Sequence, residues 1–169
     1  QIGGIYWTPF TDWARDPERT VDAAPEYKYK DIYLYANGKP QELDGAYAVD
    51  PTHPAVEAMM KKTSGLFHRA GFEYVKMDFM THGAMEADKW YNPEITTGIQ
   101  GYNYGMKLLN QYFGDMYINL SISPVFPAQY AQSRRIACDA WNQIKDTEYT
   151  LNALSYGWWQ KYIYQYNDA

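Results

Sequence analysis

Two aspartates, Asp78 and Asp139, each belong to a short apolar run, and each has a basic residue just before it. Lys76 stands two positions before Asp78 in YVKMDFM, and Arg135 stands four positions before Asp139 in RRIACDA. Two carboxyl groups across a polar cleft suit glycoside hydrolysis, in which one attacks or stabilises an oxocarbenium-like centre and the other protonates the leaving oxygen. The simpler interpretation of Lys-x-Asp on a strand is a charge pair satisfied inside a core.

The two carboxyl groups must differ in protonation for this chemistry. Positions i and i+2 of a strand point the same way, so Lys76 would lie beside Asp78 and favour its charged form, which suits a nucleophile. Asp139 has apolar neighbours between positions 136 and 141, and their desolvation would favour a proton on it. Arg135, a cation four positions before Asp139, would instead favour the charged form of this carboxyl group.

Strand and helix patterns alternate along the chain. Apolar strand-like runs cover 2–9, 74–80, 116–124 and 136–141, and helical patterns cover 52–70, 102–113, 128–134 and 150–166. Such alternation indicates βα units and a parallel sheet, in which functional residues sit at the carboxyl ends of the strands. Polar residues recur at these ends: Thr8, Asp12, Asp78, Ser121, Ser123 and Asp139.

Four strands are too few for a closed (β/α)8 barrel, which typically needs about 250 residues. We therefore predict an α/β fold that is part of a (β/α)8 TIM barrel, about strands three to six plus the following helix. Residues 1–169 would form a partial catalytic barrel, an internal fragment of a longer chain. Segment 14–48 is predicted to be a decorated loop with a β-hairpin insertion in the first βα loop, turning at Asn37-Gly38.

Composition excludes several classes of function. The chain is 46% hydrophobic and 18% aromatic, which is not the composition of a disordered protein. Its net charge of −5 gives no basic surface for nucleic acid or for an anionic membrane, and no apolar run is long enough to span one. One cysteine and three scattered histidines make no convincing metal site, so we expect neither metal nor organic cofactor. No signal-peptide pattern is visible; the compartment stays open, and a periplasmic or secreted location is compatible.

Four motifs, GIYW, DPTHPAV, YVKMDF and RRIACDAW, occur in this order and resemble the melibiase-type α-galactosidases of glycoside hydrolase families twenty-seven and thirty-six. The resemblance covers most of the chain apart from residues 14–48. It implies a (β/α)8 barrel that cleaves terminal α-galactosides with retention, through a covalent galactosyl intermediate. By this resemblance Asp78 is the nucleophile, Asp139 is the general acid/base, and Lys76 and Arg135 bind sugar hydroxyls.

The resemblance also implies that Tyr6 lines the galactose pocket and that Ser123 lies near the sugar's 2-substituent. Trp7, at the end of the same strand as Tyr6, is an additional candidate for sugar stacking. Two departures leave the subfamily and the substrate open: SISP lacks the carboxylate common in family twenty-seven, and Phe79-Met80 replaces a cysteine-containing turn. The acidic pair that holds the 4- and 6-hydroxyls is expected on an earlier strand, outside this chain.

Alternative functions share the same aspartate pair. They are a related α-glycosidase or transglycosylase acting on β-L-arabinopyranosides, α-N-acetylgalactosaminides or α-glucosides, and a non-catalytic carbohydrate-binding barrel fragment. The expected partners are a glycoside or oligosaccharide, the remaining barrel strands and a possible second copy of the chain. Weaker site candidates are Trp13, Trp90, His82 and Asp12, whereas His53 and His68 are expected to cap or cover a helix.

Overall fold

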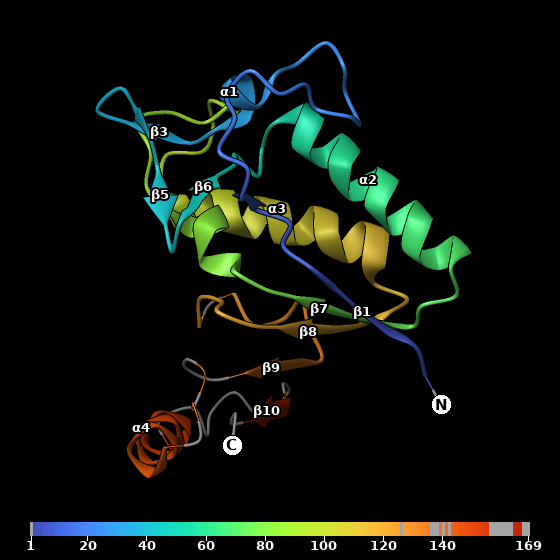
Figure 1. Cartoon of the computed structure of the whole chain (residues 1–169), viewed down its shortest axis with the longest axis vertical. Helices are drawn as coiled ribbons and strands as arrows, with labels where there is room; N and C mark the ends of the chain where they lie inside the picture. The colour runs from blue at the N-terminus through green and yellow to red at the C-terminus, as the bar shows by residue number, and fades with distance from the viewer. Residues whose placement is uncertain are drawn as a thin grey trace.

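A five-stranded parallel sheet organises the chain. The computed structural model describes residues 2–125, 127–135, 139, 141, 143–155 and 164–166. The strands are β1 (Gly4–Trp7), β7 (Tyr74–Met77), β8 (Tyr117–Leu120), β9 (Ser133–Arg135) and β10 (Tyr164–Tyr166). They lie side by side in chain order, and each adjacent pair is parallel (Figure 1). The order never reverses, unlike that of a doubly wound sheet, in which ligands bind where the strand order changes direction.

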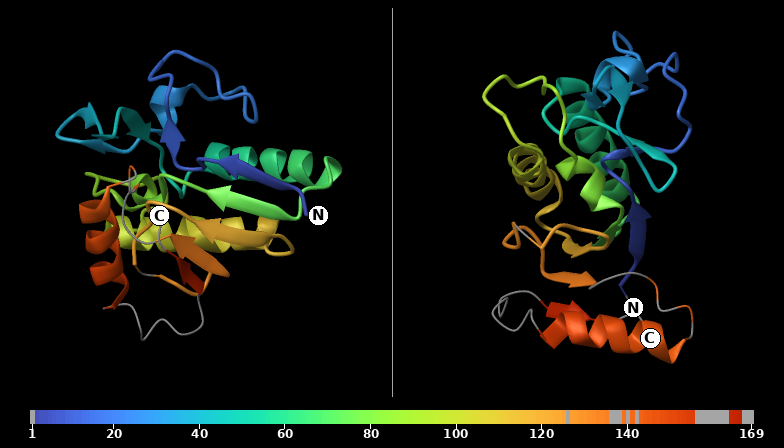
Figure 2. Two further views of the ribbon diagram at one scale, coloured as in Figure 1. Left: turned by 60° about the horizontal axis from the view of Figure 1, so that its bottom comes forward. Right: turned by 90° about the vertical axis from the view of Figure 1, so that its left-hand side faces the viewer.

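Two amphipathic helices cover one face of this sheet. Helix α2 (Pro54–Arg69) joins β1 to β7 and helix α3 (Gly98–Phe113) joins β7 to β8, and the two helices contact each other (Figures 1 and 2). The residues that face the sheet are fully buried and form one core with the strands. They include Val56, Met60, Tyr102, Met106, Leu109 and Phe113 from the helices and Val75, Met77 and Ile118 from the strands. Leu66 of α2, in contrast, is exposed.

Local sequence signals set the ends of α2. Pro54 occupies its first turn, and the Nδ1 atom of His53 accepts a hydrogen bond from the backbone N of Ala55 at 3.1 Å. Gly71 follows the helix with a φ of 78°, a left-handed conformation that glycine adopts without a steric penalty. The expected capping role of His53 is therefore confirmed.

The segment between β1 and α2 forms two small antiparallel sheets and a short helix. It contains β2 (Thr11–Asp12), α1 (Tyr29–Ile32), β3 (Tyr35–Ala36), β4 (Lys39–Pro40), β5 (Glu42–Leu43) and β6 (Ala46–Ala48). Strands β3 and β4 pair across Asn37-Gly38, and β5 and β6 pair across Asp44-Gly45. All four turn residues have positive φ, the requirement of a two-residue type I′ turn. The second hairpin was not predicted, although Asp44-Gly45 is a strong turn signal.

The carboxyl-terminal part differs from the sequence prediction. Residues 133–135 form β9 rather than the end of a helix, and the helix expected over 150–166 is instead α4 (Ile144–Ser155) followed by β10. A short polar segment such as AQYAQSR fits both the helical period of about 3.6 residues and the strand period of two. Residues 133–135 form a strand because they pair with β8. The strand predicted for 136–141 falls largely outside the described residues, as do Cys138, Trp158 and Trp159.

Candidate active site

The face of the sheet turned away from α2 and α3, called the inner face below, carries the polar side chains. Successive strand residues point to opposite faces. Val75 and Met77 of β7 belong to the core beneath the helices. Tyr6 of β1, Lys76 of β7 and Asn119 of β8 are partners in the sheet register, so they stand in one row on the inner face.

Asp78 continues β7 at its carboxyl end, where its backbone N donates to the carbonyl of Trp7 at 2.9 Å. Its side chain is 9% exposed; Oδ1 accepts from the backbone N of Phe79 at 2.8 Å, and Oδ2 lies 3.6 Å from Nζ of Lys76. The Lys76 side chain is 31% exposed, so this ion pair is not sealed inside a core. Phe79 has a φ of 53°, rare for a non-glycine residue, and the sharp bend brings its N–H to the carboxylate.

Tyr6 joins this pair from the neighbouring strand. Nζ of Lys76 lies 5.8 Å from the centre of the Tyr6 ring. Burial, followed by the charge of Asp78 and a hydrogen bond to it, raises the pKa of Tyr6. The hydroxyl therefore stays protonated and can donate to the carboxylate. Three predicted site residues, Tyr6, Lys76 and Asp78, are thus brought together.

Arg135 and Asp139 form a second ion pair, with Nη1 and Oδ1 2.6 Å apart. The Arg135 side chain is 6% exposed on β9, whereas the Asp139 side chain is 48% exposed. The apolar surroundings expected for Asp139 are therefore not what the structure shows, because the carboxylate is half exposed and paired with a cation. This corrects the sequence-based argument that desolvation would hold a proton on it.

Ser121 is a residue that the prediction of the site left out. Leu120 pairs with Met77, and the backbone N of Ser121 donates to the carbonyl of Met77, so Ser121 lies next to Asp78 on the inner face. Its side chain is fully buried, and Oγ has no hydrogen-bond partner among the described residues. Alternation from Asn119 would have indicated it.

Ser123, the predicted residue, lies two positions further along the same loop. Its Oγ is buried and has no partner in the part of the chain that the structure describes, and its carbonyl accepts from Nη2 of Arg134 at 3.0 Å. Ile122, between the two serines, has a φ of 42°, and its carbonyl accepts from both N and Oγ1 of Thr81. The loops after β7 and β8 are therefore tied together at the carboxyl ends of the strands.

Trp7 does not join the Tyr6–Lys76–Asp78 group. Its ring stacks on Phe113 of α3 with centroids 5.5 Å apart and meets the edge of Phe67 of α2 at 6.5 Å. These contacts place Trp7 between the sheet and the helices, on the face opposite Tyr6. Alternation along β1 explains this, because Tyr6 and Trp7 are adjacent. The expectation that Trp7 stacks on a sugar is therefore corrected to a packing role.

Trp13 and His82 lie beside Phe79. The Trp13 ring meets Phe79 edge to face at 4.7 Å, and its Nε1 donates to Oγ1 of Thr8 at 3.2 Å. Trp13 is 45% exposed, so part of its ring is open to a ligand. His82 is fully buried, and its ring nitrogens lie 3.0 and 2.8 Å from the carbonyl oxygens of Phe79 and Leu43. His82 therefore supports the loop and does not face solvent.

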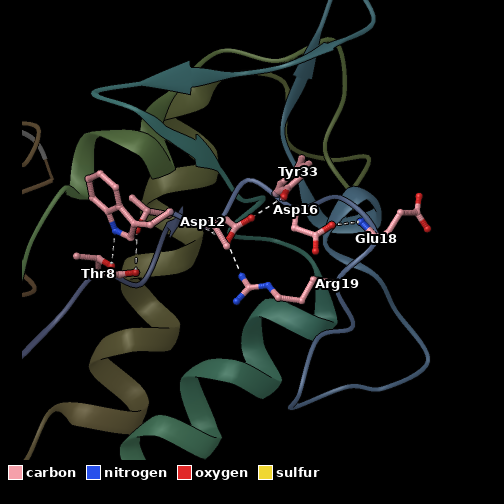
Figure 3. A network of polar contacts seen from close by, with 9 residues as sticks. Thr8, Asp12, Asp16, Glu18, Arg19 and Tyr33 are labelled. Carbon is pink, nitrogen blue, oxygen red and sulfur yellow. Dashed lines mark hydrogen bonds and ion pairs between the residues drawn. The ribbon is translucent and has the colours of Figure 1, made fainter.

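The carboxylate of Asp12 accepts hydrogen bonds from residues of the segment that follows β1. Oδ2 accepts from the hydroxyl of Tyr33 at 2.5 Å, and Oδ1 pairs with Arg19 and accepts from the backbone N of Ala14 at 3.2 Å (Figure 3). The side chain is 1% exposed. Burial and the bond to Asp12 raise the pKa of Tyr33, which keeps this donor protonated. Asp12 thus anchors the segment rather than contacting a substrate.

Neither a metal-binding cluster nor a membrane-spanning helix is found in the described part of the chain. Its His, Cys, Asp and Glu side chains form no group of three or more that could hold a metal ion. Among the helices described, none is long and apolar enough to cross a membrane.

No protein-family model and no curated protein matches the chain. Among solved structures, similar folds are those of glycoside hydrolase TIM-barrel proteins, and this chain has the same α/β fold with a parallel sheet. One neighbour is an α-galactosidase from Thermus thermophilus in complex with p-nitrophenyl α-D-galactopyranoside, with a TM-score of 0.64 and 21% identity. The match covers 89% of this chain and 30% of that one.

Two further neighbours act on related sugars. A family GH27 β-L-arabinopyranosidase from Geobacillus stearothermophilus matches with a TM-score of 0.59 and 18% identity, over 98% of this chain and 37% of that one. A family GH36 α-galactosidase from the same organism matches with a TM-score of 0.54 and 14% identity, over 95% of this chain and 22% of that one. The chain therefore spans about a third or less of the length of these neighbours.

Proposed function

We propose that this chain is part of the catalytic barrel of a retaining α-galactosidase that hydrolyses terminal α-galactosides. The observation that carries the proposal is the position of Asp78. It ends a central parallel strand on the inner face, with its carboxylate beside Lys76 and within reach of the Tyr6 hydroxyl. The carboxyl ends of the strands are where barrel enzymes place their catalytic groups.

In this proposal the reaction runs by double displacement. The Asp78 carboxylate attacks the anomeric carbon while the Asp139 carboxyl group gives its proton to the leaving oxygen, so that a glycosyl ester forms and the aglycone departs as an alcohol. Asp139 then takes a proton from water, which attacks the same carbon and releases Asp78. Lys76, Arg135, Tyr6 and Ser123 would contact sugar hydroxyls, and no metal or organic cofactor is required.

The strand arrangement supports a barrel in which this chain supplies consecutive strands. The five parallel strands follow one another across the sheet in chain order, and α2 and α3 both cover the same face of this sheet. That is the arrangement of a (β/α)8 barrel wall, whose inner face is filled by side chains. The remaining strands would come from the rest of the protein, and the segment between β1 and α2 would be the insertion in the first βα loop.

A β-L-arabinopyranosidase is the second candidate. A GH27 enzyme with this activity matches 98% of the chain. Its sugar has the hydroxyl arrangement of α-galactose but lacks the exocyclic hydroxymethyl group, so Lys76, Arg135 and Tyr6 would bind both sugars. A non-catalytic sugar-binding barrel is the alternative outside enzymes.

The decisive experiment compares aryl α-galactoside, aryl β-L-arabinopyranoside and aryl β-galactoside as substrates of the protein that contains this chain. We expect the α-galactoside to be hydrolysed fastest. A fluorinated galactosyl substrate that slows the second step should leave a covalent label on the peptide containing Asp78, seen by mass spectrometry. A label on another peptide would refute the nucleophile assignment.

Matched aspartate variants test the roles separately. Asp78→Asn and Asp139→Asn should each lower kcat/KM by a factor of about 10³ or more. Asp12→Asn should instead reduce the amount of folded protein and leave the kcat/KM of the folded protein unchanged. Binding of galactose without turnover of any glycoside would favour the binding-protein alternative. In a galactose complex we expect the carboxyl groups of Asp78 and Asp139 to be about 5–5.5 Å apart, since a separation of about 6.5–9.5 Å indicates inversion.

A further inference from the structure

A cavity whose lining includes neither Asp78 nor Asp139 lies between the segment after β1 and the loop after β7. Its volume is about 440 Å³, within the usual range of small-molecule sites. Four aromatic side chains line it, Tyr33 and Tyr35 from the first segment and Trp90 and Tyr91 from the second. Both segments leave the sheet at the carboxyl ends of strands, so the cavity lies toward the same end of the barrel wall as Asp78.

The charges around this cavity balance. Lys30 and Lys89 contribute two positive charges, and Asp31 and Asp50 contribute two negative charges. Asp50 is already satisfied, because Oδ1 accepts from Thr52 and Oδ2 accepts from the backbone N of Tyr91 at 2.6 Å. Such a lining has no net charge to attract an anion or a cation, and it favours a neutral ligand.

His53 supplies a buried hydrogen-bond donor at the cavity wall. The residue is only 4% exposed, and its ring lies between Tyr27 and Tyr91 at centroid distances of 4.7 and 4.6 Å. Nδ1 accepts from the backbone N of Ala55, so in the neutral ring the proton sits on Nε2. Burial lowers the pKa of His53, which keeps the ring neutral at pH 7. Within the described part of the chain, Nε2 has no hydrogen-bond partner.

We propose that this cavity is a second, non-catalytic carbohydrate site that holds a neutral sugar unit. Aromatic rings pack on the apolar faces of pyranoses, while the His53 Nε2–H and the Lys89 ammonium donate to sugar hydroxyls. Lys89 makes no ion pair with any described residue, so its donors are available. The site does not depend on Asp78 or Asp139 and goes beyond the proposed hydrolysis: it would hold a distant unit of an oligosaccharide or glycan.

The test is calorimetric titration of the protein carrying Asp78→Asn with stachyose, a neutral galacto-oligosaccharide, while 1-deoxygalactonojirimycin saturates the galactose site. We expect saturable binding to remain under this block. Tyr91→Ala and Lys89→Ala should weaken it at least 10-fold, and so should His53→Asn, which keeps a helix cap but removes the Nε2 donor. Tyr149→Ala, an exposed tyrosine on α4, is the matched control and should leave the affinity unchanged.

Two outcomes would overturn the second site: no stachyose binding under the block, or equal affinity in the parent and in Tyr91→Ala with both folded by thermal melting. Binding of inorganic phosphate in preference to stachyose would also overturn it, because the lining would then select an anion. Failure of the proposed hydrolase function is recognised separately. In that case 1-deoxygalactonojirimycin would not bind the parent protein at all, while stachyose binding would still be lost in the cavity variants.

Discussion

At the scale of single residues, the environment of Asp78 fits the nucleophile role that we propose for it. Three donors approach it: the N–H of Phe79, the ammonium of Lys76 and the hydroxyl of Tyr6. The Lys76 ammonium is a cation close to the carboxylate, and the other two are neutral hydrogen-bond donors that orient it. Such preorganised donors act most strongly where water is excluded.

Tyr6→Phe tests the role of the hydroxyl next to Asp78. Hydrogen bonds to charged groups contribute about 1.5–3 kcal/mol, so kcat/KM should fall about 10- to 100-fold. Tyr117→Phe is the matched control, because Tyr117 lies on the same inner face at the opposite ends of the strands, where Tyr74 stacks on it. Equal loss in both variants would mean that the Tyr6 hydroxyl has no special role at Asp78.

At the scale of elements, alanine substitutions at two helical glycines separate the effect of side-chain packing from that of intrinsic helix propensity. A Cβ on Gly105 of α3 would lie 2.7 Å from Cβ of Pro51 and 2.8 Å from Cζ of Phe10, so Gly105→Ala should destabilise the protein by about 1–3 kcal/mol. A Cβ on Gly65 of α2 would meet only the mobile Nη1 of Arg69 at 3.2 Å, so Gly65→Ala should stabilise it by about 0.5–1 kcal/mol. Urea denaturation midpoints measure both, and a stabilising Gly105→Ala would contradict the packing of α3 on Phe10.

The two ends of α2 should respond to pH in opposite directions. Burial lowers the pKa of His53 at the amino end, so its contribution to stability is complete above the unfolded value of about 6.5 and is lost as the pH falls below it. A hydrogen bond to Asp115 raises the pKa of His68 in the last turn. Its contribution is complete below about 6.5 and is lost as the pH rises through the folded pKa.

Denaturation of His53→Asn and His68→Gln on both sides of about pH 6.5 checks these signs. The first variant should lose less stability on acidification than the parent, because Asn caps the helix without titrating. The second should lose less on alkalinisation. The same pH dependence in the parent and both variants would show that other groups control acid stability.

At the scale of the whole molecule, apolar side chains are exposed on the inner face of the sheet and around the start of α4. A cavity of about 710 Å³ opens on the inner face against Tyr74 and Tyr117, and Tyr117 is 41% exposed. At the other end of the described chain, Ile144 of α4 is 87% exposed and Trp141 is 73% exposed. Large exposed apolar patches mark surfaces that bind another part of a protein.

We therefore predict that the 169-residue chain on its own is inactive and binds a hydrophobic dye, because its sheet edges and inner face are open. In the longer protein, Tyr117 should be protected from chemical modification by the other barrel strands. Comparison of tyrosine modification in the two proteins by mass spectrometry provides the measurement. A monomeric, cooperatively melting and active isolated chain would disprove the partial-barrel proposal.

Features that depend on neighbours along the chain were predictable from the amino-acid sequence. Pro54 and Gly71 mark the ends of α2 because proline and glycine restrict or free the backbone locally. Asn37-Gly38 marks a hairpin turn for the same reason. The spacing of Lys76 and Asp78 placed them on one face because strand side chains alternate with a fixed period of two.

The face of each strand that packs against the helices, and the groups around each charge, depend on contacts between distant segments and were not predictable from local patterns. Trp7 was predicted to stack on a sugar, yet its ring packs against Phe67 of α2 and Phe113 of α3. Strand register and helix position together fix which face of β1 packs against these helices. Asp12 was a candidate, yet Tyr33 and Arg19, distant in sequence, occupy its carboxylate. The cavity around His53 likewise arises from contacts between segments far apart in the chain, which no local pattern records.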